Sequence, residues 1–294
     1  MTMLQIKLNS GIEMPMLGYG VYQVTPQECE RCVSDALALG YRHIDTAQAY
    51  NNEREVGNAI KKSGIDRKEI FITSKVWISN FGYEKTMASV EESLRKLQTD
   101  YIDLMLLHQP FGDVYGAWRA LEELVQMGKV RAIGISNFYV DRFVEFCQFA
   151  CGDWTKPDGT IVKGILPAVN QIEIHPYHIQ STQIEWMKKY NVTPEAWAPL
   201  DEGRDNIFND KTLLAIAQKY SKSLHQIVLR WHMQRGQVTF PMSRNKAHMA
   251  ENLNIFDFTL TDEDMKAIDS LDKGKSSFFS HQDPSIVEWF HQMA

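Results

Sequence analysis

The sequence predicts an α/β fold in which eight βα units close into a (β/α)8 TIM barrel, with an N-terminal β-hairpin and long loops on the C-terminal face. Short apolar runs alternate with amphipathic stretches along the chain, which is typical of βα units around a parallel sheet. Eight such runs indicate a closed barrel more naturally than a doubly wound sheet. No shift in composition divides the chain, so we expect a single domain over residues 1–294.

The chain begins with a hairpin signal. Residues 5–8 and 12–15 alternate in polarity around the turn residues Asn9, Ser10 and Gly11, and we expect this hairpin to plug one end of the barrel. The strands of the barrel, each followed by a helix, are expected at 16–20, 41–44, 70–73, 102–107, 130–135, 168–172, 193–198 and 238–240.

Helix ends carry their own signals. Thr25 before Pro26 is typical of an N-cap with proline in the first helical position. Gly40 and Gly128 each follow an amphipathic stretch and indicate helix C-termini.

Three segments are longer than ordinary connections. Residues 150–166 follow the fifth helix and are expected on the face away from the chemistry, whereas 201–210 follow the seventh strand and are expected on the catalytic face. The tail 272–294 contains Phe278, Phe279, Trp289 and Phe290. These aromatic side chains need burial, either in the wall of a substrate pocket or against the barrel exterior.

Composition excludes several classes of protein. The net charge of −6 argues against a surface for nucleic acid, and no run reaches the roughly 20 apolar residues of a membrane helix. Residues 1–10 lack the apolar core of a signal peptide, so we expect a cytoplasmic protein.

The pairs Cys29/Cys32 and Cys147/Cys151 have spacings found in zinc or redox sites. Both lie in helical patterns, which favours reduced, structural thiols.

Four titratable side chains stand where apolar runs stop: Asp45, Tyr50, Lys75 and His108. In a barrel the strand ends converge on one face, so these groups are expected to meet. An ammonium beside a phenol stabilises the phenolate, and a carboxylate keeps a buried ammonium charged. His108 would orient a substrate oxygen that the phenol protonates. Taken singly, each residue is more often a cap, a solvated charge or a core group, and we assign His43 to packing.

At these residues the chain resembles the aldo-keto reductases, and the resemblance covers nearly all of it. The matching stretches are GYRHIDTA at 40–47 with Tyr50, Asn52 and Glu53, ITSKVW at 72–77, LLH at 106–108, GISNF at 134–138, NQIE at 170–173, WAPL at 197–200 and EN at 251–252. The resemblance implies reduction of an aldehyde or ketone with NAD(P)H, with Tyr50 as the general acid and Asp45, Lys75 and His108 in the roles given above.

The same resemblance implies where the cofactor and substrate bind. Ser136, Asn137 and Gln171 would hold the nicotinamide carboxamide, and Trp197 would stack on its ring. No G-x-G-x-x-G follows a strand, so the pyrophosphate is expected in the loops 200–203 and 243–252. The cofactor contacts on the seventh and eighth units would be Pro199, Leu200, Ser243, Arg244, His248, Glu251 and Asn252. The substrate pocket would be lined by Tyr22, Trp77 and Phe111, which suit apolar carbonyl compounds.

One departure from the family pattern concerns the cofactor. Many relatives have cations at the positions of Met242 and His248, where they bind the 2′-phosphate of NADPH. Arg244, two residues beyond Met242, is placed to take over that phosphate. We therefore expect NADP(H) to be the cofactor, with use of NAD(H) possible as well.

Two other functions fit parts of the sequence. A noncatalytic barrel that binds a nicotinamide cofactor as a sensor or accessory subunit is one, although the four titratable residues argue against it. A metal-dependent hydrolase is suggested by His175 and His178, but both follow one strand, whereas such sites draw ligands from around the barrel mouth. We expect a monomer; the physiological carbonyl substrate stays open.

Overall fold

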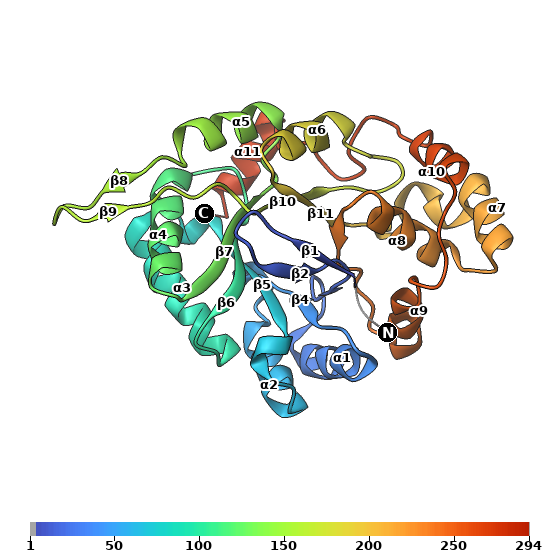
Figure 1. The fold of residues 1–294 in the computed structure, drawn as a ribbon, viewed down its shortest axis with the longest axis horizontal. Coiled ribbons are helices and arrows are strands. Elements are labelled where there is room, and N and C mark those ends of the chain that lie inside the picture. The colour runs from blue at the N-terminus through green and yellow to red at the C-terminus, as the bar shows by residue number, and fades with distance from the viewer. Residues whose placement is uncertain (1–3, 294) are drawn as a thin grey trace.

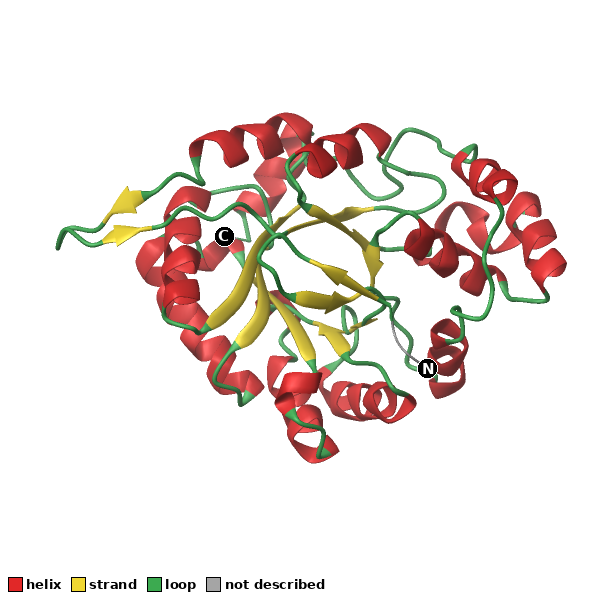
Figure 2. Ribbon diagram, in the orientation of Figure 1, coloured by secondary structure: helices red, strands yellow, loops and turns green. Residues whose placement is uncertain are grey.

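The computed structural model describes residues 4–293 and forms the expected barrel. Figure 1 and Figure 2 show a ring of strands with helices around it. Eight parallel strands run in the order β12-β11-β10-β7-β6-β5-β4-β3, and the parallel bridge between Leu17 and Thr239 closes the ring. The strands are β3 (Tyr19–Gly20), β4 (His43–Asp45), β5 (Phe71–Val76), β6 (Ile102–Leu107), β7 (Val130–Ser136), β10 (Val169–Glu173), β11 (Thr193–Trp197) and β12 (Val238–Thr239).

The N-terminal hairpin closes one end of this barrel, as expected. Its strands β1 (Gln5–Lys7) and β2 (Glu13–Pro15) pair antiparallel. Leu8 and Met14 are buried in one apolar cluster with Phe71 and Leu104, which come from the barrel strands. This end is therefore filled with apolar side chains, and chemistry is confined to the opposite mouth.

The helices that cover the ring follow the sequence signals. They are α1 (Pro26–Leu39), α2 (Glu53–Ser63), α3 (Tyr83–Leu97), α4 (Val114–Gln126), α5 (Val140–Phe149), α6 (Ser181–Lys189), α7 (Lys211–Tyr220), α8 (Leu224–Gln234), α9 (Lys246–Leu253), α10 (Asp262–Asp269) and α11 (Pro284–His291). Short 3-10 helices are η1 (Gln48–Tyr50), η2 (Arg67–Glu69) and η3 (Ile78–Asn80), and the segment η4 (Asp201–Asn209) contains 3-10 turns that are interrupted by non-helical backbone at residues 202–206. Thr25 is the N-cap of α1 and Gly40, at φ 111°, ends it in the left-handed conformation that glycine adopts freely.

Two local differences from expectation have physical reasons. The strand expected at 41–44 begins only at His43, because Tyr41 packs towards α9 and its hydroxyl donates to the Met249 carbonyl at 2.9 Å. The segment 150–166 carries a small hairpin of β8 (Trp154–Thr155) and β9 (Ile161–Val162), which projects from the barrel in Figure 1. Buried Glu122 anchors it by accepting from Trp154 Nε1 at 2.8 Å.

The four cysteines form no disulfide within residues 4–293. All four are free thiols, three of them buried, and burial raises the pKa of Cys29 to about 12. Within residues 4–293, no three His, Cys, Asp or Glu side chains are grouped to hold a metal ion. No helix in the described part of the chain is long and apolar enough to cross a membrane.

Candidate active site

The C-terminal mouth of the barrel brings the four titratable residues together. Asp45 ends β4 and Lys75 lies near the end of β5, and both point inward from neighbouring parallel strands. Lys75 Nζ donates to Asp45 Oδ1 at 2.6 Å, to the Thr46 carbonyl at 2.9 Å and to Tyr50 Oη at 3.3 Å. The rings of Tyr50 and His108 pack edge to face, with centroids 5.7 Å apart. One ammonium thus links the carboxylate to the phenol.

Burial and charge oppose each other in the Lys75–Asp45 pair. Both side chains are almost fully buried, and burial alone would strip the proton from an ammonium. The charge and hydrogen bond of Asp45 outweigh burial and raise the pKa of Lys75 above its ordinary value. Lys75 is therefore a permanent cation beneath the phenol.

Tyr50 is protonated at neutral pH. Burial raises the pKa of the phenol to about 12, while Lys75 acts in the opposite direction and lowers it. The ammonium therefore limits, and does not reverse, the effect of burial. Such a phenol stays protonated at neutral pH and can donate its proton when negative charge develops on a substrate oxygen.

His108 is a neutral imidazole. Burial, and then the charge of Lys75, lower its pKa well below the ordinary value. Its Nδ1 is buried without a hydrogen-bond partner among the described residues, while the ring lines the cavity. A neutral imidazole orients an oxygen ligand by hydrogen bonding and adds no charge to the site.

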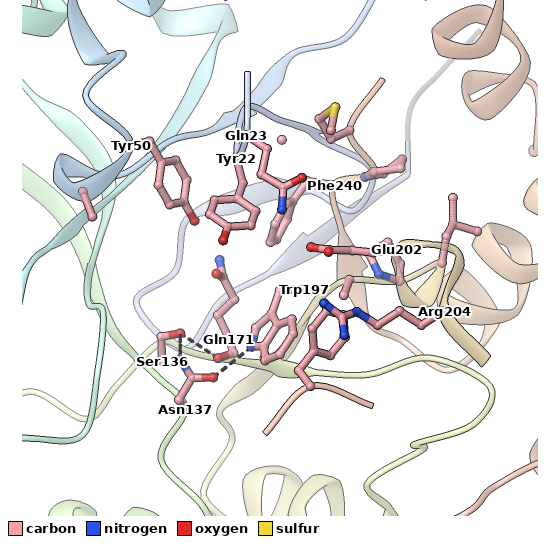
Figure 3. A pocket seen from close by; sticks show the side chains of 18 of the residues that line it. Tyr22, Gln23, Tyr50, Ser136, Asn137, Gln171, Trp197, Glu202, Arg204 and Phe240 are labelled. Atoms are coloured by element: carbon pink, nitrogen blue, oxygen red, sulfur yellow. Dashed lines mark hydrogen bonds between the residues drawn. The ribbon is translucent and has the colours of Figure 1, made fainter. Parts of the chain in front are cut away.

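A polar wall faces this group across the mouth (Figure 3). Ser136 Oγ donates to the Gln171 carbonyl at 2.9 Å, and Trp197 Nε1 donates to Asn137 Oδ1 at 2.9 Å. The Asn137 Nδ2 group also donates to the His108 carbonyl at 3.2 Å. These hydrogen bonds hold the side chains of Ser136, Asn137 and Trp197 in place before any ligand arrives.

A cavity of about 1070 Å³ extends from this group towards α9. It exceeds the roughly 300–1,000 Å³ of an ordinary small-molecule pocket, so it can take an extended dinucleotide together with a substrate. The predicted residues that line it are Tyr22, Tyr50, Trp77, His108, Ser136, Asn137, Gln171, Trp197, Pro199, Leu200, Ser243, His248, Glu251 and Asn252. These residues fit a nicotinamide cofactor. At one end of the cavity, the amide and hydroxyl groups of Ser136, Asn137 and Gln171 lie beside the ring of Trp197, and the loop before α9 lies at the other end.

Two predicted contacts lie elsewhere. Arg244 is not among the lining residues; its side chain is 54% exposed and pairs with Glu28 at 3.3 Å. Phe111 lies behind the wall, because the rings of His281 and Phe290 from the tail stand against it, with the Phe290 centroid at 5.3 Å. Phe111 is therefore not among the residues that line the cavity in this structure, and the tail supplies the wall beside it.

Further lining residues come from the tail and from segment 201–210. The tail contributes Phe278, Phe279, His281, Trp289, Phe290 and Met293, which decides between the two places left open for its aromatic side chains. Segment 201–210 lies on this face as expected and contributes Glu202, Arg204 and Phe208. The guanidinium of Arg204 lies 4.2 Å from the Phe278 ring centroid, so segment and tail touch over the cavity. In the sequence, the aromatic residues of the tail were the signal that the tail lines the cavity.

Three comparisons relate this chain to known proteins. The Aldo/keto reductase family description matches residues 15–273. Glyoxal reductase of Bacillus subtilis (strain 168) is 45% identical over 270 residues, which cover 91% of this chain and 92% of that protein.

Solved structures agree with the family match. An aldo/keto reductase from Brucella melitensis superposes with a TM-score of 0.85 at 42% identity, covering 92% of this chain and 100% of its own. The Bombyx mori aldo-keto reductase in complex with NADP superposes with a TM-score of 0.86 at 30% identity, covering 98% and 97%.

Proposed function

The chain belongs to the aldo/keto reductase family and reduces aldehydes or ketones to alcohols with NAD(P)H, and we propose that Tyr50 is the general acid of this reaction. The observation that carries the proposal is the bridging ammonium, since Lys75 Nζ contacts both Asp45 and Tyr50 in a buried site. The bound cofactor supplies the hydride that adds to the carbonyl carbon.

The side chains handle the proton and the negative charge on oxygen. His108 donates a hydrogen bond to the carbonyl oxygen and holds it beside the phenol. Tyr50 Oη transfers its proton to that oxygen as charge develops there. Lys75 stabilises the resulting phenolate from 3.3 Å, and Asp45 keeps Lys75 charged.

The polar wall would bind the nicotinamide end of NADP(H). Ser136, Asn137 and Gln171, which line the cavity, would hold its carboxamide, and Trp197 would stack on its ring. Pro199, Leu200, Ser243, Glu251 and Asn252 would contact the rest of the dinucleotide. The NADP-bound Bombyx mori relative supports this cofactor.

We also propose that NADH is accepted. Met242 carries no charge, and Arg244 is the cation nearest in sequence in this loop. In the structure Arg244 is already paired with Glu28, so a 2′-phosphate would have to draw it away from a carboxylate. Recognition of the extra phosphate is weakened accordingly, although not removed.

The aromatic wall supports apolar aldehydes or ketones as substrates. Trp77, Phe279 and Phe290 line the same cavity as Tyr50, and the Trp77 ring centroid lies 5.1 Å from that of His108. A panel of aromatic and aliphatic aldehydes and ketones, assayed by loss of NADPH absorbance, tests the proposal. Turnover of at least one aromatic aldehyde is expected; cofactor binding with no turnover of any panel member would favour a noncatalytic barrel.

We further propose a cytoplasmic monomer. The four free thiols support a reducing compartment. Cell fractionation and light scattering of the purified protein test the location and the oligomeric state.

A further inference from the structure

Glu195 is a buried acid that the proposed mechanism does not use. It lies on β11, two residues before Trp197, and is fully buried. Its register partners on the neighbouring strands are Gln171 and Val238. Side chains two apart on a strand share a face, so Glu195 points into the barrel directly beneath the floor of the cavity.

The surroundings of Glu195 make a purely space-filling role costly. Glu195 lies between the buried apolar cluster that contains Leu106, Val169 and Val238 and a few buried polar groups, of which Gln171 is its hydrogen-bond partner. A carboxyl group in such a place loses its hydration, and an apolar side chain would fill the same space without that loss. The hydrogen bonds of Glu195 should therefore explain why an acid occupies this position.

Its bond is to Gln171, and that amide is shared. Gln171 Nε2 donates to Glu195 Oε2 at 2.9 Å and to Asp45 Oδ2 at 3.0 Å. An amide nitrogen has two hydrogens, so both are taken by carboxyl groups. The amide oxygen is then the end of Gln171 that faces a ligand in the cavity.

These two hydrogen bonds fix the orientation of the Gln171 amide. The oxygen and nitrogen of a glutamine amide exchange places by a half-turn of the side-chain end, at little steric cost. Because the ionised Asp45 carboxylate can only accept, the orientation with the nitrogen inward is the one that satisfies both amide hydrogens, one on Asp45 and one on Glu195. An amide oxygen presented to the cavity accepts from the NH2 group of a nicotinamide carboxamide.

We propose that Glu195 is a positioning residue of the reductase, which holds the Gln171 amide with its oxygen towards the nicotinamide carboxamide and ties that amide to the Asp45–Lys75 pair. The inference rests on the proposed role of Gln171 in binding the cofactor. The chain of contacts runs from Glu195 through Gln171 and Asp45 to Lys75 and the phenol of Tyr50.

The state of the acid is compatible with this role. Burial, together with the nearby charge of Asp45, raises the pKa of Glu195 to about 8. The other titratable groups that face it are Lys75 and His43, whose Nε2 lies 3.9 Å from Glu195 Oε1. Glu195 is thus neutral at pH 7 and accepts from Gln171 without setting a second negative charge beside Asp45.

A double-mutant cycle on NADPH affinity tests the inference. The variants are Glu195→Met, Gln171→Ala and the pair together, with Kd measured by quenching of tryptophan fluorescence. Losing one neutral hydrogen bond that orients the amide should raise the Kd about three- to tenfold in Glu195→Met. In the Gln171→Ala background the second substitution should change the Kd less than about twofold, because the amide it positions is gone.

Two further variants separate positioning from packing. Glu195→Gln keeps an acceptor of the same shape and should hold the Kd within about twofold of the wild type. If Glu195 ionises near pH 8, the wild-type plot of kcat/KM against pH should show an inflection there, and the plot for Glu195→Gln should lack it because glutamine does not ionise. Glu122→Gln is the matched control, since Glu122 is equally buried but bonds Trp154 away from the cavity; it should leave the Kd unchanged.

The outcomes distinguish the inference from its premise. A Kd unchanged in Gln171→Ala would contradict the proposed cofactor contact itself. If Gln171→Ala weakens binding but Glu195→Met does not, or if the two effects simply multiply, Glu195 is a packing residue and the inference is overturned. Circular dichroism on each variant identifies loss of fold, and Glu195→Gln then carries the test through its pH profile.

Discussion

Lys75 Nζ lies 2.6 Å from Asp45 Oδ1, and neither side chain has more than 1% of its surface exposed. A buried ion pair of this kind adds little to stability, because desolvation of both ions offsets their attraction. Its position beneath Tyr50 gives it another use. The pair delivers a fixed positive charge to a phenol that has to release a proton.

Removing one member of the pair should cost stability and activity separately. Lys75→Met leaves the Asp45 carboxylate buried and unpaired, so we expect a loss of about 3–5 kcal/mol in the free energy of unfolding. The double variant Asp45→Asn with Lys75→Met removes both charges and should recover most of that stability. Its kcat should stay at least about a hundredfold below the wild type. Urea unfolding and NADPH oxidation measure the two effects; recovery of activity in the double variant would refute the role of the ammonium.

Cofactor preference should depend on Arg244. Arg244→Ala should lower kcat/KM with NADPH about tenfold and leave the value with NADH nearly unchanged, because only NADPH carries the phosphate. Lys246→Ala is the matched control, since Lys246, at the start of α9, is equally exposed at 54% and pairs with Asp35. A preference for NADPH above about a thousandfold in the wild type would exceed what a single charged contact supplies and would contradict dual use.

The aromatic tail should affect the substrate and not the cofactor. Phe290 is buried against Phe111 and His281 and stands in the cavity wall. Phe290→Ala should raise the KM of an aromatic aldehyde about tenfold through lost contact area, with the Kd of NADPH unchanged. Phe149→Ala on α5, where the ring is 79% exposed, is the control. An equal rise in both constants would mean that the tail supports the whole cavity.

Acid should destabilise the protein through His232. Burial lowers the pKa of this imidazole from 6.5 to about 3, so the folded state holds it neutral. Between these values the unfolded state binds a proton that the folded state does not, and stability therefore falls as the pH drops. The slope from this group is about 1.4 kcal/mol per pH unit. Urea unfolding from pH 7 to 4 should show a smaller slope in His232→Gln; an identical slope would exclude His232 as a source.

Much of the barrel and of the site could be predicted because the signals are local. Asp45, Lys75 and His108 each end an apolar run, and strand ends in a barrel converge whatever their distance in sequence. The family resemblance then predicted Gln171 and Trp197 as cofactor contacts, and both line the cavity in the structure.

What the sequence could not predict depends on distant contacts. Glu195 interrupts an apolar strand, and a single acid there is equally typical of a solvent-facing position; only the closed barrel shows that it faces Gln171. Phe111 was placed on the wall, but Phe290 from nearly two hundred residues later lies against it. Such packing is set by the tail as a whole and leaves no periodic signal in the chain.

The most direct test of the account is the Tyr50→Phe variant, assayed for turnover of a reactive aromatic aldehyde and for NADPH binding by fluorescence. Lys75 Nζ contacts the Tyr50 hydroxyl. Replacing tyrosine by phenylalanine removes this hydroxyl, which is the proton donor, and leaves the residues of the polar wall in place. We predict that kcat falls at least about a hundredfold while the Kd of NADPH stays within about twofold. Turnover at the wild-type rate in this variant would contradict the assignment of Tyr50 as the acid.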